Sequence, residues 1–342
     1  MKKTVVAVTM GDPCGIGPEI VVQALAAQET QRQALCLVCG DRGVLQLAMQ
    51  ATGVSLRIHE IRSVQEAADE PGTLNLVSLP DTEPVDPACF EWGKVSAMGG
   101  RAAYAYIAAA VRLALEGSAD AVCTAPVNKE SLRAASVPYI GHTEIFGALT
   151  GSPAPLTMFE TCGMRIFFLT RHLSLRKMLD EITQDNIVRC VKECQAALQR
   201  LGAGGQRMAV AGLNPHSGEH GLFGDEEVRE IAPAVERLRQ EGLDVEGPVS
   251  ADSVFHLCAA GKYGSVLSLY HDQGHIAAKT LDFARTISIT NGLPFLRTSV
   301  DHGTAFDIAG TGKASAVSMM EAIRLAAKYA PAFCRGAGQA AI

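Results

Sequence analysis

Short apolar runs typical of β-strands alternate with helical patterns along the whole chain. Thr4–Met10 is rich in β-branched residues, and a helical pattern follows it over Gly17–Ala27. The same order recurs in Ala34–Cys39 and Gly43–Thr52. Strands that alternate with helices of ten or more residues indicate an α/β fold, with a largely parallel sheet covered by helices on both faces.

The alternation continues into the C-terminal region. Further strands are expected at Ala119–Thr124, Leu156–Thr161, Met164–Thr170, Arg207–Ala211 and Val266–Tyr270. Further helices are expected at Val95–Glu116, Thr183–Leu201, Glu226–Glu241 and Met319–Tyr329. The second and third of these strands lie close enough in the sequence to form a hairpin. The stretch Pro71–Trp92, rich in proline and acidic residues, is expected to be a loop.

The length of the chain indicates two domains, because 342 residues exceed the roughly 100–200 residues of one domain. We expect a boundary near Pro126–Asn128, with the C-terminal region returning to the first domain. Residues 1–127 and 303–342 would then form a first, discontinuous α/β domain. Residues 128–302 would form the second.

Charge and hydropathy exclude several classes of protein. The balance of 30 lysines and arginines against 36 acidic residues gives a net charge of −6, without a basic run. Nucleic acid and anionic membranes are therefore not expected as partners. The apolar start ends at Gly11 without a cleavage site, and the apolar helix Ala102–Leu115 is too short to span a bilayer. Most of the ten cysteines lie in apolar stretches, so we expect a cytoplasmic protein with buried thiols.

Three of the nine histidines follow predicted strands directly. His172, His216 and His271 are separated by 44 and 55 residues, and each interval is close to one β–α–β unit. Three imidazoles at one edge of a sheet could bind a divalent metal and leave positions open for a substrate. Asp252 and Asp272 lie near them in the sequence. Such ligands suit zinc first, with cobalt, nickel, iron or magnesium as alternatives.

A metallohydrolase is the alternative interpretation of the same histidines. Both His216–His220 and His271–His275 have the spacing H-x-x-x-H. A metalloprotease needs such a pair on one helical turn, with glutamate directly after the first histidine. Here Ser217 and Asp272 occupy that position, and each motif contains a glycine, so this alternative is remote.

Several segments could bind an anion. Gly11–Glu19 combines glycines with a helix N-terminus, although Ile20 stands where a dinucleotide fingerprint has its third glycine. Asp41 follows the second strand, where a ribose-binding acid could lie. His142 and Thr143 lie beside a glycine, and Lys279 and Arg297 are downstream cations. Arg297 is the stronger candidate because it lies between glycine-containing segments that carry few charges.

Six segments together resemble the 4-hydroxythreonine-4-phosphate dehydrogenase family. They are Gly11–Glu19, Thr124–Lys129, Gly141–Glu144, Asn214–Gly224, Tyr270–Gly274 and Gly292–Ser299. The resemblance extends from Thr4 to Lys328. Two segments, Gly15–Glu19 and His302–Gly310, are also similar to the isocitrate and isopropylmalate dehydrogenases.

This resemblance implies two α/β/α domains of the isocitrate and isopropylmalate dehydrogenase type, with the active site in the interdomain cleft. It assigns His172, His216 and His271 in the second domain as ligands of a divalent metal, at sites shared between the subunits of a homodimer. Substrate contacts are assigned to His142, Thr143, Lys279, Ser288 and Arg297. Ser288 replaces the asparagine that the family usually has. The resemblance assigns the cofactor loop to His302, Gly303, Thr304, Ala305 and Asp307.

The implied activity is a metal-dependent oxidative decarboxylation with NAD, or alternatively NADP. Its substrate would be a phosphorylated four-carbon 3-hydroxy acid, namely 4-hydroxythreonine-4-phosphate in pyridoxal phosphate biosynthesis. The alternative is 4-phospho-threonate or 4-phospho-erythronate in sugar-acid catabolism, which Gly274–Ile276 resembles. Asp252, Asp272 or Lys279 would move the protons, and the sequence does not choose among them.

Overall fold

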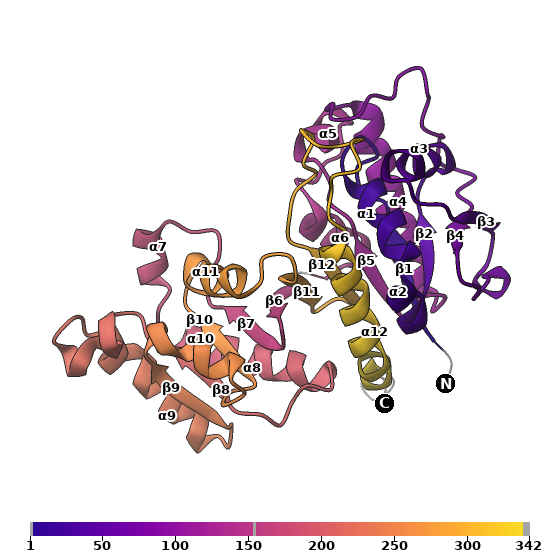
Figure 1. The fold of residues 1–342 in the computed structure, drawn as a ribbon. Helices are drawn as coiled ribbons and strands as arrows, with labels where there is room; N and C mark the ends of the chain where they lie inside the picture. The colour runs from indigo at the N-terminus through magenta and orange to yellow at the C-terminus, as the bar shows by residue number, and fades with distance from the viewer. Residues whose placement is uncertain (1–2, 153–154, 338–342) are drawn as a thin grey trace. The chain divides into compact units, whose positions relative to one another are not determined.

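The computed structural model describes residues 3–152 and 155–337, and its chain divides into two compact units (Figure 1). The first unit comprises Met1–Pro155 and Ile287–Ile342, and the second comprises Leu156–Thr286. These bounds differ from the predicted 127/128 and 302/303. The reason is packing: helix α5 (Lys129–Ala134) lies against helix α4 (Ala97–Leu115) so closely that a Cβ at Gly100 would meet the Ser131 carbonyl oxygen at 2.0 Å.

The first unit is built on a largely parallel sheet. Its strands are β1 (Thr4–Thr9), β2 (Ala34–Cys39), β3 (Arg57–Ile61), β4 (Thr73–Val77), β5 (Ala121–Thr124), β11 (Ile287–Asn291) and β12 (Leu296–Val300). They are arranged in the order β3-β4-β2-β1-β5-β12-β11, and the β11–β12 pair is antiparallel. The strands β1, β2 and β5 are mostly apolar, as expected where helices cover both faces of a sheet.

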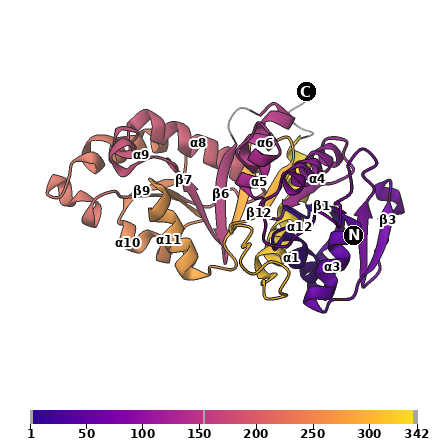
Figure 2. The same ribbon diagram turned by 90° about the horizontal axis from the view of Figure 1, so that it is seen from above.

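Helices flank this sheet on both sides (Figure 2). They are α1 (Gly17–Ala26), α2 (Gln28–Gln33), α3 (Arg42–Thr52), α4, α5, α6 (His142–Thr150) and α12 (Val317–Ala337). Helices α4, α5 and α6 lie on one face, and α1, α3 and α12 lie on the other. This arrangement leaves the carboxyl ends of the parallel strands open to loops, where ligands bind in open α/β sheets.

The second unit repeats the same design on a smaller scale. Its strands are β6 (Leu156–Thr161), β7 (Met164–Phe168), β8 (Met208–Ala211), β9 (Val245–Val249) and β10 (Ser265–Ser268), in the order β6-β7-β10-β8-β9. Its helices are α7 (Leu175–Asp180), α8 (Gln184–Arg200), α9 (Ala232–Gln240), α10 (Ala251–Ala259) and α11 (His271–Leu281). Helices α8 and α9 cover one face of the strands, and α10 and α11 cover the other (Figure 2).

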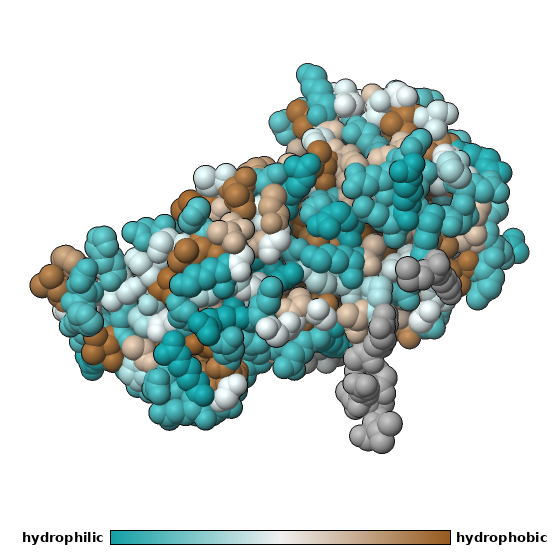
Figure 3. Space-filling model, turned by 60° about the horizontal axis from the view of Figure 1, so that its bottom comes forward, coloured by the Kyte–Doolittle hydropathy of each residue, from teal (hydrophilic) through white to brown (hydrophobic). Residues whose placement is uncertain are grey.

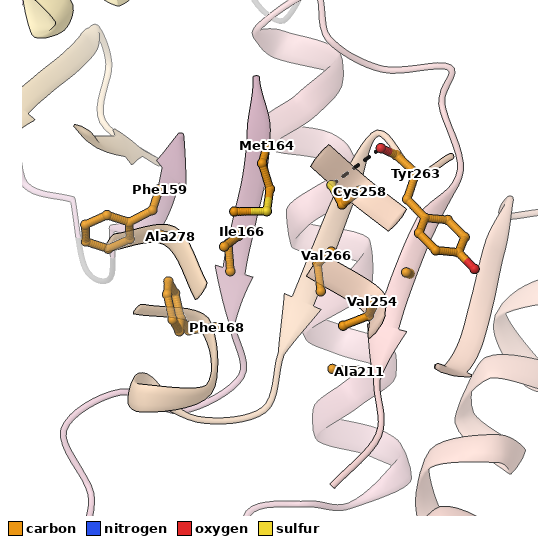
Figure 4. Packing of buried hydrophobic residues seen from close by; sticks show 11 residues of the cluster. Phe159, Met164, Ile166, Phe168, Ala211, Val254, Cys258, Tyr263, Val266 and Ala278 are labelled. Atoms are coloured by element: carbon orange, nitrogen blue, oxygen red, sulfur yellow. Dashed lines mark hydrogen bonds between the residues drawn. The ribbon is translucent and has the colours of Figure 1, made fainter. Parts of the chain in front are cut away.

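The core of the second unit lies between its strands and the helices α10 and α11. Aromatic side chains of β6 and β7, Phe159 and Phe168, lie at one end of a buried cluster, and Tyr263 lies at the other (Figure 4). Val254 of α10 and Val266 of β10 are fully buried between them. The cluster fixes α10 and α11 against the sheet, and α11 begins at one of the predicted metal ligands.

The predicted α/β class with a largely parallel sheet is confirmed, and so is the hairpin, because β6 and β7 pair antiparallel. The expected loop Pro71–Trp92 is wrong in part, since it contains strand β4. Asn75 interrupts the apolar pattern of that strand, but its side chain forms two hydrogen bonds with the backbone of Ala68. No helix within the described parts of the chain is long and apolar enough to cross a membrane.

Candidate functional site

Two of the three predicted metal ligands lie close together in the second unit. Strands β7, β10 and β8 are parallel neighbours, and His172, His271 and His216 follow their carboxyl ends. The backbone pairing between β7 and β10 continues beyond the end of β7, because the Leu169 amide donates to the Ser268 carbonyl at 2.8 Å. The ring centroids of His172 and His271 are 6.1 Å apart. The predicted delivery of histidines to one sheet edge therefore agrees with the strand order.

His216 does not complete a three-ligand site within one chain. Among the described residues, 3–152 and 155–337, no three His, Cys, Asp or Glu side chains lie close enough together to hold a metal ion. His216 lies in an exposed turn, Pro215–Gly221, whose residues 216–220 all have positive φ. Four of these are not glycine, a backbone conformation that costs about 1–2 kcal/mol per residue. Other groups must hold this turn in place.

Glu227 is the group that holds the turn. Its carboxylate is 2% exposed and accepts hydrogen bonds from the backbone amides of Leu213 and Asn214, at 2.7 and 2.6 Å. The Asn214 side chain also donates to it, at 2.9 Å. A Cβ at Gly218 would meet this carboxylate at 2.9 Å, so the glycine is required by close packing. Sequence analysis missed Glu227 because it lies in a helical stretch with exposed charged neighbours.

Gln273 ties two of the three strand ends, those of β10 and β8, together. Its side-chain oxygen accepts from the Leu269 amide at 2.7 Å and from the Ser268 hydroxyl at 3.1 Å, both after or within β10. Its side-chain nitrogen donates to the Gly212 carbonyl, directly after β8, at 2.8 Å. One amide thus links the start of α11 to the beginning of the His216 loop.

The candidate proton-transfer groups lie on α11 and at the start of α10. Asp272 is exposed, and its carboxylate lies 2.6 Å from His271 Nδ1, a contact that favours a proton on Nδ1 and leaves Nε2 to bind a metal. Lys279 is two turns further along α11, with its Nζ 5.2 Å from the centre of the Phe283 ring. Asp252 is exposed in the first turn of α10. Asp272 is the one of these carboxylates that contacts a predicted ligand.

Arg297 is a buried cation in the first unit. Its side chain is on β12, is 4% exposed, and donates to the hydroxyls of Thr290 and Thr124 at 3.0 and 2.8 Å. The guanidinium lies 4.8 Å above the Phe146 ring. No carboxylate within the described residues pairs with it, and its Nε has no hydrogen-bond partner there. Burial lowers the pKa of Arg297 to about 10, so the group stays charged at neutral pH.

His142 lies next to this cation. It is the first residue of α6, and its ring centre is 6.3 Å from that of Phe146, the ring on which Arg297 rests. Burial, and secondly the charge of Arg297, hold the pKa of His142 well below its usual range. Its Nε2 is buried without a hydrogen-bond partner in the described parts of the chain. Thr143, the next residue, is exposed.

The register of β11 places Ser288 on the same face of the sheet as Arg297. Thr290 pairs directly with Arg297, and Ser288 pairs with Ser299. Directly opposed residues share a face, and so do residues two apart along a strand. The predicted substrate residues Ser288, Arg297 and His142 therefore belong to one part of the first unit. Lys279 belongs to the second unit.

A charged guanidinium and polar nitrogens without partners are costly to bury unless a ligand satisfies them. Arg297 Nε and His142 Nε2 are two such atoms. Both can donate a hydrogen bond, and the positive charge favours an anionic acceptor. The arrangement is therefore suited to a phosphate or carboxylate. Asn291 is a further candidate, which the sequence did not indicate. It is 3% exposed, and neither its side-chain oxygen nor its side-chain nitrogen has a hydrogen-bond partner among the described residues.

The predicted cofactor loop is anchored firmly at two points. The Thr304 carbonyl accepts from the Ile16 amide at 3.0 Å, and the Thr304 side chain is 3.5 Å from the Asn128 amide nitrogen. Glu19, fully buried, accepts hydrogen bonds from the backbone amides of Gly310 and Gly312 at 2.8 and 2.6 Å. Glu19, missed by sequence analysis, therefore fixes the far end of the loop.

The remaining loop residues face outward or are strained. Gly303 is exposed, and a Cβ added to it would meet no atom within 4 Å. His302 lies beside it, with Nδ1 3.0 Å from the Gly303 carbonyl oxygen, and Asp307 is exposed. Ala305 has a φ of +40°, which the anchored loop imposes. The open side at Gly303 leaves room for a bound cofactor.

The glycine-rich segment Gly11–Glu19 is wrong as an anion cradle, because all of its residues are buried. Its glycines serve close packing: a Cβ at Gly17 would meet the Met10 carbonyl oxygen at 2.2 Å, and one at Gly15 would meet the Thr304 side chain at 2.8 Å. Asp41 also has another role. Its carboxylate accepts from the amide of Val44, capping α3, and from that of Val85.

Replacing Glu19 by glutamine is expected to lower the free energy of unfolding. Glutamine offers one acceptor oxygen, so one of the amides of Gly310 and Gly312 loses its partner, at a cost of about 1–3 kcal/mol. Urea denaturation measures the change, and Glu116→Gln, at an exposed residue after α4, is the matched control. Equal stability of both variants would contradict the anchoring role of Glu19.

Comparisons with known proteins agree with one another. Residues 32–326 match the model of the family described as "Pyridoxal phosphate biosynthetic protein PdxA". A relative in Symbiobacterium thermophilum, provisionally named D-threonate 4-phosphate dehydrogenase, is 57% identical over 97% of this chain and 98% of its own length. One of the same provisional name in Fusobacterium nucleatum is 56% identical, with the same coverage.

Solved structures lead to the same family. The crystal structure of 4-hydroxythreonine-4-phosphate dehydrogenase from Klebsiella pneumoniae superimposes with a TM-score of 0.85 and is 43% identical. The match covers 96% of this chain and all of that one. Every one of these relatives is named as a dehydrogenase, which confirms the predicted class of enzyme.

Proposed function

We infer that this chain, which belongs to the pyridoxal phosphate biosynthetic protein PdxA family, catalyses the NAD- and metal-dependent oxidative decarboxylation of a phosphorylated four-carbon 3-hydroxy acid. The observation that carries this proposal is the buried Arg297, whose charge meets no carboxylate within the described residues. A phosphorylated acid supplies the missing anion. The dehydrogenase names of the relatives supply the class of reaction.

The two candidate substrates differ at C2. D-threonate 4-phosphate has a hydroxyl there, and 4-hydroxythreonine-4-phosphate has an amine. We place the sugar acid first, because the relatives that carry its name are 56–57% identical to this chain. The amino acid, the substrate expected from the sequence, is the second candidate and is supported by the Klebsiella structure at 43% identity.

The reaction balances with the groups that the chain provides. The C3 hydroxyl loses a proton and C3 loses a hydride, which gives a 3-keto acid. The keto acid loses CO₂ from C1, and C2 takes up a proton. Residues 302–307 would hold NAD, which would supply the hydride acceptor. Arg297 and His142 would hold the phosphate or the carboxylate, and Asp272, Asp252 or Lys279 would carry protons between C3 and C2.

A divalent cation would be held by His172, His216 and His271, and it supplies positive charge where the C3 oxygen becomes anionic. The donor set fits this role in part, because the rings of His172 and His271 lie near each other, with centroids 6.1 Å apart, and no third ligand among the described residues joins them. We propose that a second copy of the chain completes each site. Zinc is the metal best suited to three imidazoles.

Exposed apolar side chains of the second unit support the homodimer. They follow the predicted ligands in the sequence: Leu173 directly follows His172, Ile276 comes five residues after His271, and Leu222 and Phe223 come six and seven residues after His216. Hydrophobic residues are visible among hydrophilic ones on the surface (Figure 3). Clustered exposed apolar side chains commonly mark a protein interface. The nine described cysteines are all free, which fits a reducing compartment such as the cytoplasm.

Mixed subunits test the shared site. His216→Ala and His271→Ala homodimers should each be inactive. When their subunits are exchanged, half of the dimers are mixed and each has one intact site, so activity should return to about a quarter of the wild-type value. Subunit exchange verified by mass spectrometry without any recovery would show that each site is built within one chain.

Substrate preference is tested by steady-state NADH production with the two acids in parallel. We expect kcat/KM for D-threonate 4-phosphate to exceed that for 4-hydroxythreonine-4-phosphate. CO₂ should be released in equal amount to NADH. Turnover of neither acid, with a metal-loaded dimer, would refute the proposed function.

A further inference from the structure

The His271 ring lies at one end of a column of packed aromatic rings. His275 is one helical turn further along α11, and its ring lies 3.9 Å from that of His271, at an interplanar angle of 21°. Phe168 of β7 stacks on His275 in turn, with centroids 4.9 Å apart and planes at 26°. Phe159 of β6 closes the column edge-on, 4.3 Å from His275. His275 is buried, whereas the His271 side chain is 41% exposed.

The backbone leaves His275 little freedom to move. A Cβ at Gly274 would meet Phe168 at 2.6 Å and Ile166 at 2.9 Å, so only glycine lets α11 approach β7 this closely. Phe159 and Phe168 themselves belong to the buried cluster of the second unit, near Ala278 of α11 (Figure 4). The column is therefore rigid at its base, and it ends at a half-exposed imidazole.

We propose that His275 is a positioning residue that sets the plane of the His271 imidazole for metal binding. The inference rests on the proposed function, in which His271 is a metal ligand. A ligating imidazole must point its lone pair at the ion, and neighbouring groups that fix the ring tune metal affinity. Asp272 restrains His271 at Nδ1, and the flat face of His275 prevents the ring from tilting about that contact.

A flat aromatic ring is the property that this role requires. Parallel, closely spaced rings attract one another beyond simple burial. A branched aliphatic side chain at position 275 could fill the same volume but would give His271 no plane to rest on. Phenylalanine would keep the plane and lose the ring nitrogens. The two substitutions therefore separate positioning from core filling.

The test is a titration of the metal-free dimer with Co²⁺, followed by visible absorption. His275→Leu should weaken Co²⁺ binding by about 10- to 100-fold and alter the absorption band, as loss of a supporting group does. His275→Phe should stay within about threefold of the wild type, because its ring restores the stack. His256→Leu, at an exposed histidine of α10, is the matched control and should bind Co²⁺ normally.

Thermal melting of each metal-free variant separates positioning from folding. If His275→Leu and His275→Phe melt alike and both bind Co²⁺ with the affinity of the wild type, His275 only fills the core and the proposal is overturned. Equal weakening of Co²⁺ binding in both variants would make His275 a ligand itself and would overturn the proposal too. His271→Ala distinguishes that failure from failure of the proposed function. If His271→Ala itself binds Co²⁺ like the wild type, the metal site, and not the ring column, is wrongly assigned.

Discussion

Replacing His216 by alanine is expected to abolish turnover and to leave the fold intact. The side chain is exposed, so its loss removes no core contact. The bound cation is expected to contribute several kcal/mol to stabilising the anionic oxygen. Loss of about 4 kcal/mol lowers the rate by about 10³-fold. Measurements of kcat/KM, of metal content by atomic absorption and of the urea midpoint would check each part.

His220→Ala is the matched control for this experiment. His220 lies in the same turn, is exposed like His216 and also has a positive φ. It should keep near-normal activity, because the proposed site does not use it. Near-normal activity of His216→Ala with one metal per subunit would show that His216 is not a ligand. Equal loss in both variants would instead favour the H-x-x-x-H interpretation.

The sequence predicted the fold class and the strand ends well, because both depend on local patterns. β-branched runs such as Thr4–Thr9 and Ala34–Cys39 are strands over almost the predicted residues. The side chains that follow parallel strands must come to one edge of a sheet, which brought His172 and His271 together. The family and the dehydrogenase class were predicted from six motifs and are confirmed.

The supporting residues could not be predicted, because they act over long distances in the sequence. Gln273 bonds to Gly212, 61 residues earlier, and Glu19 bonds to Gly310, 291 residues later. Single polar residues of this kind have no periodicity or spacing that marks them. Asn291 is of the same kind: only its burial without a partner distinguishes it from an ordinary strand residue.

The limits of the two units depend on packing in the same way. The segment 128–155 carries α5 and α6, and both helices lie against α4. Strands β11 and β12 pair with each other, and β12 pairs with β5, so residues after 286 belong to the first unit. The boundary expected near Pro126 lies just after the end of β5, and not at the end of a unit.

Arg297→Met should reduce kcat/KM for the phosphorylated acid by about 10- to 100-fold or more, because a charge-assisted hydrogen bond contributes about 1.5–3 kcal/mol. Arg297→Lys keeps the charge but loses the planar fork that binds an oxyanion through two parallel hydrogen bonds. Its kcat/KM should therefore lie between that of the wild type and that of Arg297→Met. Titrations of substrate and of NAD with each variant would measure both affinities. The KM for NAD should barely change, because residues 302–307 form a separate, anchored loop.

The stability of Arg297→Met gives an independent check of the same assignment. A buried charge without a carboxylate partner is costly, and an apolar side chain of similar length can fill its place over the Phe146 ring. The variant loses two hydrogen bonds to threonine hydroxyls but also removes that buried charge, so its free energy of unfolding should fall by less than about 1 kcal/mol or should rise. A large loss of stability together with normal substrate affinity would make Arg297 a structural residue. Weaker NAD binding with an unchanged substrate KM would place it in the cofactor site.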